Sequence, residues 1–107
     1  MRDVVILGST GSIGVQVLEV IASNPQLFRV VAISSAGSNP ELVIAQAKQF
    51  KVSHVGVVNN AEVVSKALPG ITVIDGAKAS TEIAAINCDV VVNAIQVQLV
   101  LAQPLQP

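Results

Sequence analysis

Short, uninterrupted apolar runs alternate with helix-spaced segments along most of this chain. The apolar runs predict strands over residues 3–7, 28–34, 54–58, 71–74 and 89–94. Between them, apolar residues recur at helical spacing and predict helices over residues 13–22, 40–50, 61–68 and 77–86. Strands that are apolar throughout and separated by helices are typical of a parallel sheet covered on both faces. We therefore expect an α/β fold, a Rossmann-like doubly wound parallel sheet of about five strands in a single, incomplete domain.

The first predicted strand runs directly into a glycine-rich stretch, ILGSTGSIG, that opens the first helix. Its glycines, at positions 8, 11 and 14, have the spacing G-x-x-G-x-x-G. N–H groups at the start of a helix lack intrahelical partners, and the helix dipole makes that end partly positive, so such a loop can hold a diphosphate. Gly8 would turn the chain, Gly11 would admit the diphosphate and Gly14 would let the helix pack on the sheet. The alternative is a plain strand-to-helix turn.

Donors for a phosphate are present in this loop. The backbone N–H groups of Thr10, Ser12 and Ile13 would face the ligand, with the hydroxyl groups of Thr10 and Ser12 as further donors. A P-loop is excluded, because no Gly-Lys-Ser/Thr follows.

The turn after the second predicted strand indicates which dinucleotide would bind. NAD sites usually place an Asp or Glu there for the ribose 2′-hydroxyl. This chain has SSAGSN instead, with no acidic residue from Arg29 to Pro40. A carboxylate would repel a 2′-phosphate, whereas Ser38 and Asn39 can donate hydrogen bonds to one, so the turn favours NADP(H). Asn39 also has the sequence context of a helix N-cap before Pro40.

Composition excludes several classes of function. A net charge of −1, a pI near 5.6 and the absence of Trp and Tyr disfavour nucleic-acid binding. No apolar run reaches the ~18 residues that a membrane-spanning helix needs, and the first ten residues do not form a signal peptide, so we expect a cytoplasmic protein. Hydrophobic residues make up 51% of the chain and charged residues 12%, which suggests surface facing another domain or a homo-oligomer partner.

No residue in the chain is a strong catalytic candidate. Cys88 leads into an apolar run and is expected to be buried, and a lone cysteine rules out an internal disulfide or a multi-cysteine metal site. His54 has no ligand or catalytic partner near it in the sequence. The carboxylates fall mostly at turns or solvated helix positions: Asp3, Glu19, Glu41, Glu62, Asp75, Glu82 and Asp89. We therefore expect neither catalytic residues nor metal ligands.

The end of the chain differs from the rest. No charged residue follows Asp89, and the last four residues include two prolines. We assign residues 1–95 to the nucleotide-binding domain and residues 96–107 to a divergent apolar tail. Either the tail is partly ordered, or the chain stops or leaves its original reading frame inside a longer domain.

The series GSTGSIG, NP..F.VVA and AG.N, followed by DVVVNAI, resembles a specific family from residue 1 to about residue 95. It is similar to the N-terminal NADPH-binding domain of 1-deoxy-D-xylulose 5-phosphate reductoisomerases, enzymes of isoprenoid biosynthesis. The resemblance implies that Thr10, Gly11, Ser12 and Ile13 hold the diphosphate region of NADPH. It also implies that Gly37, Ser38 and Asn39 hold the 2′-phosphate, although some members carry a basic residue in place of Ser38.

For the complete enzyme, the resemblance implies rearrangement of a sugar phosphate and its reduction by NADPH with Mg²⁺ or Mn²⁺. The family's ANKE motif, its acidic metal ligands and its separate catalytic domain have no counterpart here. We therefore expect an inactive cofactor-binding portion of such an enzyme. The alternatives are a stand-alone nucleotide-binding module, and the cofactor domain of another reductase, such as the semialdehyde dehydrogenase type.

Overall fold

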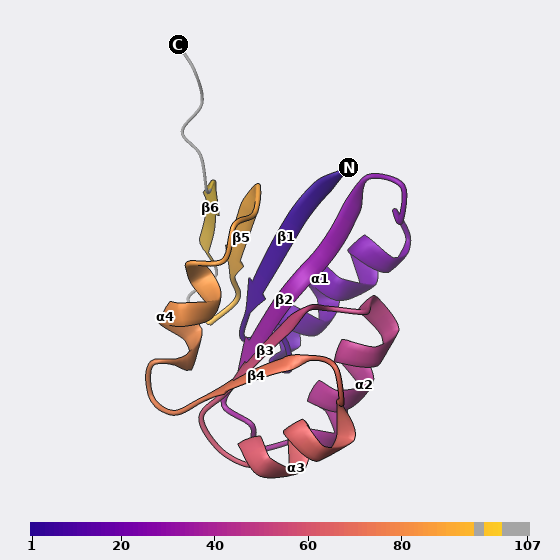
Figure 1. Cartoon of the computed structure of the whole chain (residues 1–107). Helices are drawn as coiled ribbons and strands as arrows, with labels where there is room; N and C mark the ends of the chain where they lie inside the picture. Colours follow the sequence, from indigo (N-terminus) through magenta and orange to yellow (C-terminus); the bar gives the residue numbers. More distant parts are fainter. Residues whose placement is uncertain (96–97, 102–107) are drawn as a thin grey trace.

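One sheet organises the molecule, with the strand order β4-β3-β2-β1-β5-β6 (Figure 1). The computed structural model describes residues 1–95 and 98–101. The strands are β1 (Arg2–Leu7), β2 (Phe28–Ser35), β3 (His54–Val57), β4 (Thr72–Asp75), β5 (Val90–Asn93) and β6 (Gln98–Leu101). β1 to β5 pair in parallel, and β6 pairs with β5 in antiparallel fashion. The predicted parallel sheet is confirmed.

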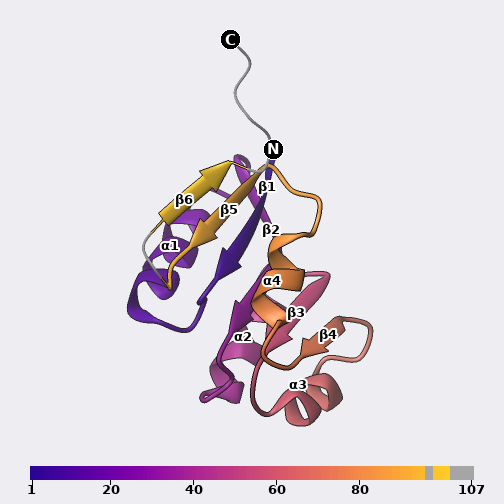
Figure 2. The ribbon, with the colours of Figure 1, turned by 90° about the vertical axis from the view of Figure 1, so that its left-hand side faces the viewer.

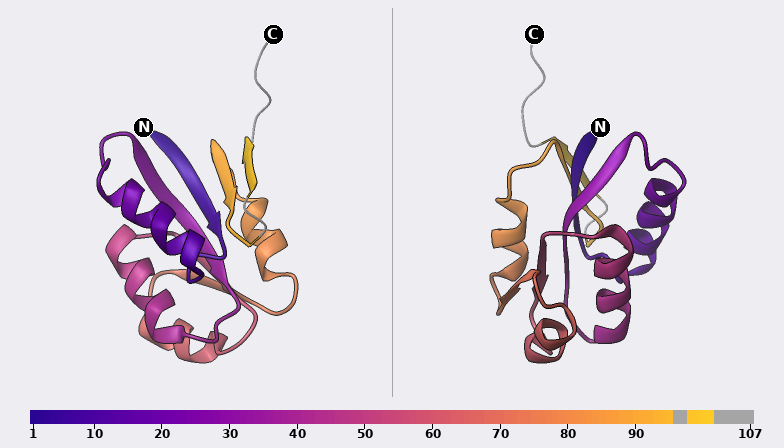
Figure 3. Two further views of the ribbon diagram at one scale, coloured as in Figure 1. Left: turned by 180° about the vertical axis from the view of Figure 1, so that it is seen from behind. Right: turned by 45° about the vertical axis from the view of Figure 1, so that its right-hand side comes forward.

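Helices cover both faces of the sheet, as the apolar strands predicted (Figure 3). They are α1 (Ser12–Ala22), α2 (Pro40–Phe50), α3 (Ala61–Ala67) and α4 (Ala79–Ala84). Buried side chains of α1, α2 and α3 form one core cluster with the sheet, and α4 contributes Ile83 to a second cluster with Val5, Ala32 and Val91. The fold is therefore doubly wound. Within the described residues, no helix is long and apolar enough to cross a membrane.

The direction of winding reverses at β1. From β1 the chain proceeds outward through β2, β3 and β4, and it then returns through α4 to place β5 on the other side of β1. Figure 2 shows β5 and β6 on the side of β1 that faces away from β2. Ligands of such sheets bind beyond the carboxyl ends of the strands at this reversal. The topology therefore predicts a ligand site beyond the carboxyl ends of β1 and β5.

Local sequence signals explain several element ends. The Asn39 side chain accepts a hydrogen bond from the Leu42 N–H (3.3 Å) and caps α2, with Pro40 at the first helical position. α1 ends at Ala22, ahead of the predicted Asn24-Pro25 stop. Most boundaries lie within one residue of the prediction, but β4 as a whole lies one residue later than residues 71–74, and α4 is shorter than residues 77–86. The end of β4 and the start of α4 lie close to Gly76, where no side chain caps the helix, so local sequence does not define them sharply.

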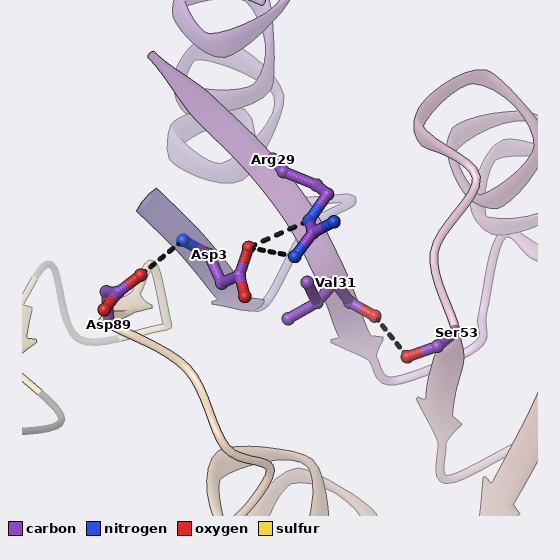
Figure 4. Close-up of polar contacts among 5 residues, drawn as sticks. All are labelled: Asp3, Arg29, Val31, Ser53 and Asp89. Atoms are coloured by element: carbon purple, nitrogen blue, oxygen red, sulfur yellow. Dashed lines mark hydrogen bonds and ion pairs between the residues drawn. The ribbon is translucent and has the colours of Figure 1, made fainter. Parts of the chain in front are cut away.

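A bulge in β2 sets which side chains reach each core. β1 pairs Val4 with Val30 but Val5 with Ala32, so Val31 is an extra residue in β2. The carbonyl of Val31 accepts hydrogen bonds from the backbone N–H and from the hydroxyl of Ser53, each at 2.9 Å. Figure 4 shows the bond from the hydroxyl. The extra residue lets β2 change its alternation of faces while that carbonyl remains paired.

A sixth strand, β6, lies in the segment that we assigned to an apolar tail. It pairs with β5 in the register Val90 to Leu101 and Asn93 to Gln98. The connection between the two strands is only four residues long, which permits an antiparallel partner but is too short for a parallel crossover. Residues 96–97 and 102–107 lie outside the described residues.

A polar cluster joins the amino ends of three strands (Figure 4). Asp89, just before β5, accepts a hydrogen bond from the Asp3 N–H at 2.7 Å and donates its own N–H to the Asp3 carbonyl at 2.9 Å. The Asp3 carboxylate in turn accepts from Arg29 of β2 at 2.8 Å. The cluster lies at the opposite end of the sheet from the carboxyl ends of the strands, so it is structural.

We predict that Asp89→Ala lowers the free energy of unfolding by about 1–2 kcal/mol, because the Asp3 N–H loses a charged acceptor. Arg29 is 61% exposed, so Arg29→Ala should cost no more than about 1 kcal/mol. Urea unfolding followed by circular dichroism measures both. Glu62→Ala, which removes an exposed pair with Lys66 on α3, is the matched control. An Asp89→Ala effect no larger than that of Glu62→Ala would contradict the structural role.

Candidate dinucleotide site

A cleft of about 520 Å³ lies at the carboxyl ends of the parallel strands. It is lined by the loop after β1, the end of β2 and the residues that follow β3 and β5, together with one residue of α4: Gly8, Thr10, Gly11, Ser12, Ile13, Ser35, Ala36, Val58, Ser80, Ala94 and Ile95. The structure therefore brings the four predicted diphosphate-loop residues together in one cleft. That cleft is at the reversal between β1 and β5, where the topology of the sheet places ligands.

The glycine loop is held in place at its start. Gly8 has φ of 81°, a conformation that favours glycine, and a Cβ there would lie 2.8 Å from the Ile95 side chain. The N–H groups of Gly8 and Ser9 both donate to the Ser34 carbonyl, at 2.8 and 2.9 Å. At Gly14, a Cβ would overlap the Gly8 carbonyl oxygen. The predicted roles of Gly8 in the turn and of Gly14 in close packing agree with this geometry.

Gly11 differs from these two glycines. Its φ is −73°, and the nearest atom to an added Cβ would be the Gly8 carbonyl oxygen at 3.7 Å, an ordinary contact. The fold therefore has room for a side chain at Gly11, and that room is on the cleft. Gly11 is the N-cap of α1 and has no side chain with which to cap the helix. Its backbone leaves space for a ligand that approaches closely.

The start of α1 has the electrostatics of an anion site. The first turn of a helix leaves N–H groups without intrahelical partners, and here these belong to Ser12, Ile13 and Gly14. The turn holds no acidic residue, so the partial positive charge of the helix end is not neutralised there. The exposed hydroxyl of Ser12 adds a donor. A diphosphate fits this set of donors.

The second predicted turn is built against the end of β3. Gly37 has φ of 85°, and an added Cβ would overlap the Asn59 carbonyl oxygen. The Gly37 N–H donates to the Ser35 hydroxyl at 3.1 Å, and the Gly37 carbonyl accepts from the Asn60 side chain at 2.8 Å. Asn59 donates from both backbone and side chain to the Ala36 carbonyl. The turn is therefore firmly held.

Ser38 and Asn39 follow this turn and are exposed. They do not line the cleft itself, but Ala36, two residues before Ser38, does. Asn39 uses its carbonyl oxygen to cap α2, so its side-chain NH₂ stays available to a ligand. Glu41 in the first turn of α2 is the nearest acidic residue along the chain. The two residues predicted to hold a 2′-phosphate thus lie at the surface, close in the chain to the cleft.

Several residues of the site were not singled out from the sequence. Ser35 and Val58 follow from strand order alone, because parallel strands end at the same edge of a sheet. Ser80 lies on α4 and donates to or accepts from Ser34 at 3.1 Å, a contact that needs the tertiary structure. Asn59 and Asn60 come just before the helix predicted over residues 61–68, and nothing in the sequence indicates that they hold the second turn.

His54 and Cys88, which the sequence did not favour as catalytic residues, do not line the cleft. His54 begins β3 at the opposite end of the sheet, with its Nδ1 2.8 Å from the Ser53 hydroxyl. Cys88 is buried as expected, and burial raises the pKa of its thiol, which disfavours the reactive thiolate. Over residues 1–95 and 98–101, no three His, Cys, Asp or Glu side chains gather into a metal site. The described residues thus do not fit Mg²⁺ or Mn²⁺.

A doubly wound sheet with a glycine-rich loop at its point of reversal places the chain among the Rossmann-like dinucleotide-binding domains. A family model for 1-deoxy-D-xylulose 5-phosphate reductoisomerase matches residues 4–106. The chain belongs to this family. The match continues past residue 95, where the resemblance in sequence motifs ended.

Individual relatives agree with the family model. The chain is 44% identical over 93 residues to the 1-deoxy-D-xylulose 5-phosphate reductoisomerase of Rhodococcus jostii, covering 86% of this chain and 23% of the relative. With the enzyme of Corynebacterium glutamicum it shares 44% identity over 110 residues, covering 97% of this chain and 28% of the relative. The chain therefore spans about a quarter of the length of these relatives.

Solved structures show the same fold. The Zymomonas mobilis reductoisomerase in complex with NADPH superimposes with a TM-score of 0.76 at 28% identity, covering 82% of this chain and 24% of that one. A reductoisomerase in complex with NADPH, fosmidomycin and magnesium superimposes with a TM-score of 0.79 at 26% identity, covering 85% and 24%. The family assignment excludes the alternative that the chain is the cofactor domain of another kind of reductase, such as the semialdehyde dehydrogenase type.

The room at Gly11 allows the fold and the ligand to be separated experimentally. We predict that Gly11→Val abolishes NADPH binding, because the side chain enters the cleft. It should lower the free energy of unfolding by only about 1 kcal/mol, the usual cost of a poor N-cap. Calorimetry and urea unfolding measure the two effects.

Two variants on the same helix serve as controls. Gly14→Val should unfold the chain through overlap with Gly8, and Ala22→Val at the exposed end of α1 should change neither property. Unchanged NADPH affinity in Gly11→Val would show that the loop is merely a turn.

Proposed function

We propose that this chain is the NADPH-binding portion of a 1-deoxy-D-xylulose 5-phosphate reductoisomerase. The observation that carries the proposal is the cleft at the ends of β1 and β5, into which the start of α1 opens. Thr10, Gly11, Ser12 and Ile13 would hold the cofactor diphosphate through backbone N–H groups and hydroxyls. Related enzymes have been solved with NADPH bound, which supports this assignment.

The second turn would select the phosphorylated cofactor. Gly37, Ser38 and Asn39 would hold the 2′-phosphate, with the Ser38 hydroxyl and the Asn39 NH₂ as donors. No carboxylate occupies the place from which NAD-specific domains hold the ribose hydroxyls. NADPH supplies a hydride when bound, and the role of this chain's residues is to bind and orient it.

We predict that the purified chain binds NADPH more tightly than NADH by about tenfold, the factor that corresponds to one or two hydrogen bonds. Ser38→Lys should raise the affinity for NADPH and leave that for NADH unchanged, because an ammonium group attracts only the 2′-phosphate. Calorimetric titration of both cofactors tests this. Ser65→Lys, at an exposed position on α3, makes the same change of net charge away from the cleft and is the matched control. Equal affinity for the two cofactors would contradict the assignment of the second turn.

The complete reaction requires more than these residues. In the family the reaction converts 1-deoxy-D-xylulose 5-phosphate to 2-C-methyl-D-erythritol 4-phosphate with NADPH and a divalent metal. This chain spans about a quarter of its relatives, and its described residues hold no cluster of metal ligands. We propose that residues 1–95 form the cofactor domain, with β6 of the following segment as its edge strand, and that the protein is cytoplasmic. The charge-poor surface would favour a homo-oligomer.

We predict that the 107 residues alone do not oxidise NADPH in the presence of 1-deoxy-D-xylulose 5-phosphate and Mn²⁺. Absorbance at the NADPH band measures turnover, with a full-length relative as the positive control. Turnover by this chain alone would show that it contains a catalytic site.

A further inference from the structure

A buried glutamine connects helix α2 to the glycine loop. Gln46 is only 6% exposed, and its Nε2 donates to the Ser9 carbonyl at 2.9 Å. A backbone carbonyl can only accept, so the group of Gln46 that faces it must be the NH₂. The contact joins two segments that are 37 residues apart in the chain.

Core packing does not explain this glutamine. Its Oε1 and the fully buried hydroxyl of Ser9 have no hydrogen-bond partner in the described part of the chain. Burial of a polar group without a partner costs free energy, and an apolar side chain of the same length would avoid that cost. The hydrogen bond from Gln46 to the Ser9 carbonyl is therefore the interaction that explains a glutamine at this position.

The bond to Ser9 determines how the next N–H group is aimed. The Ser9 N–H is held by the Ser34 carbonyl at 2.9 Å, and the Ser9 carbonyl is held by Gln46. In a planar trans peptide the carbonyl and the following N–H point in opposite directions. With the Ser9 carbonyl fixed toward α2, the Thr10 N–H points away from α2, and Thr10 lines the cleft.

We infer that Gln46 is a positioning residue of the cofactor site, which fixes the Thr10 N–H as a donor to the diphosphate. The inference rests on the proposed function. Gln46 lies on the helix that Asn39 caps, so it also sets the glycine loop relative to the turn proposed for the 2′-phosphate. It does not touch the cofactor itself.

The test compares Gln46→Met, which keeps the length of the side chain but removes the donor, with Gln49→Met at an exposed position on the same helix. We expect Gln46→Met to weaken NADPH binding by about tenfold, the factor for one hydrogen bond, and Gln49→Met to change it by less than about twofold. Adenosine 2′-monophosphate, which lacks the diphosphate, should bind both variants as it binds the unchanged chain. Equal losses for both ligands in Gln46→Met would show a merely structural role and overturn the inference.

Nuclear magnetic resonance separates this inference from the proposed function. In ligand-free protein, Gln46→Met should shift the Thr10 amide resonance, and an unmoved Thr10 resonance would overturn the inference even if NADPH binds. In the unchanged chain, the Gln46 side-chain NH₂ should exchange with solvent more slowly than that of Gln49, so equal rates would also overturn it. If the unchanged chain does not bind NADPH, the proposed function fails, while the two resonance measurements still decide the role of Gln46.

Discussion

At Gly14 the backbone of α1 lies against the carbonyl of Gly8 so closely that a Cβ would overlap it. This approach places the start of α1 directly beyond the end of β1, so the unpaired N–H groups of the helix meet the cleft. It also lets α1 cover the face of the sheet that holds the larger core cluster. The packing of the core and the position of the proposed diphosphate site thus depend on one backbone contact.

The remainder of the site is assembled from segments far apart in the chain. The Ser34 carbonyl at the end of β2 holds the two N–H groups that begin the glycine loop, and Gln46 of α2 holds the next carbonyl. Asn59 and Asn60, which follow β3, hold the second turn through Ala36 and Gly37. The binding loops are therefore braced by neighbouring strand ends, which leaves their outward donors free for a ligand.

The two ends of the sheet have different roles: a polar cluster joins the strands at their amino ends, and the cleft lies at their carboxyl ends. At the amino ends, Asp3, Arg29 and Asp89 join β1, β2 and β5 through charged and backbone hydrogen bonds. At the carboxyl ends, the same strands lead into small and polar residues that line the cleft. The carboxylates near the strand starts stabilise the sheet from the side where they cannot repel an anionic ligand.

Periodicity was enough to predict the five parallel strands and the four helices, because these depend on local preferences. The glycine spacing also singled out Thr10 to Ile13, which line the cleft, while their role in binding stays a prediction. Short elements near Gly76 had imprecise limits, since few local signals define them. The strand β6 was missed because its pairing with β5 is a tertiary contact of an uncharged segment.

The sequence by itself determined the fold class, the glycine-rich loop at the end of β1 and the lack of an acidic residue in the turn after β2. Each of these follows from residue type and spacing alone. Only the tertiary structure decided that Ser34, Gln46, Asn59 and Asn60 brace the two loops, and that the fold leaves room for a side chain at Gly11. Such contacts join distant segments, and no local pattern encodes how closely two backbones approach.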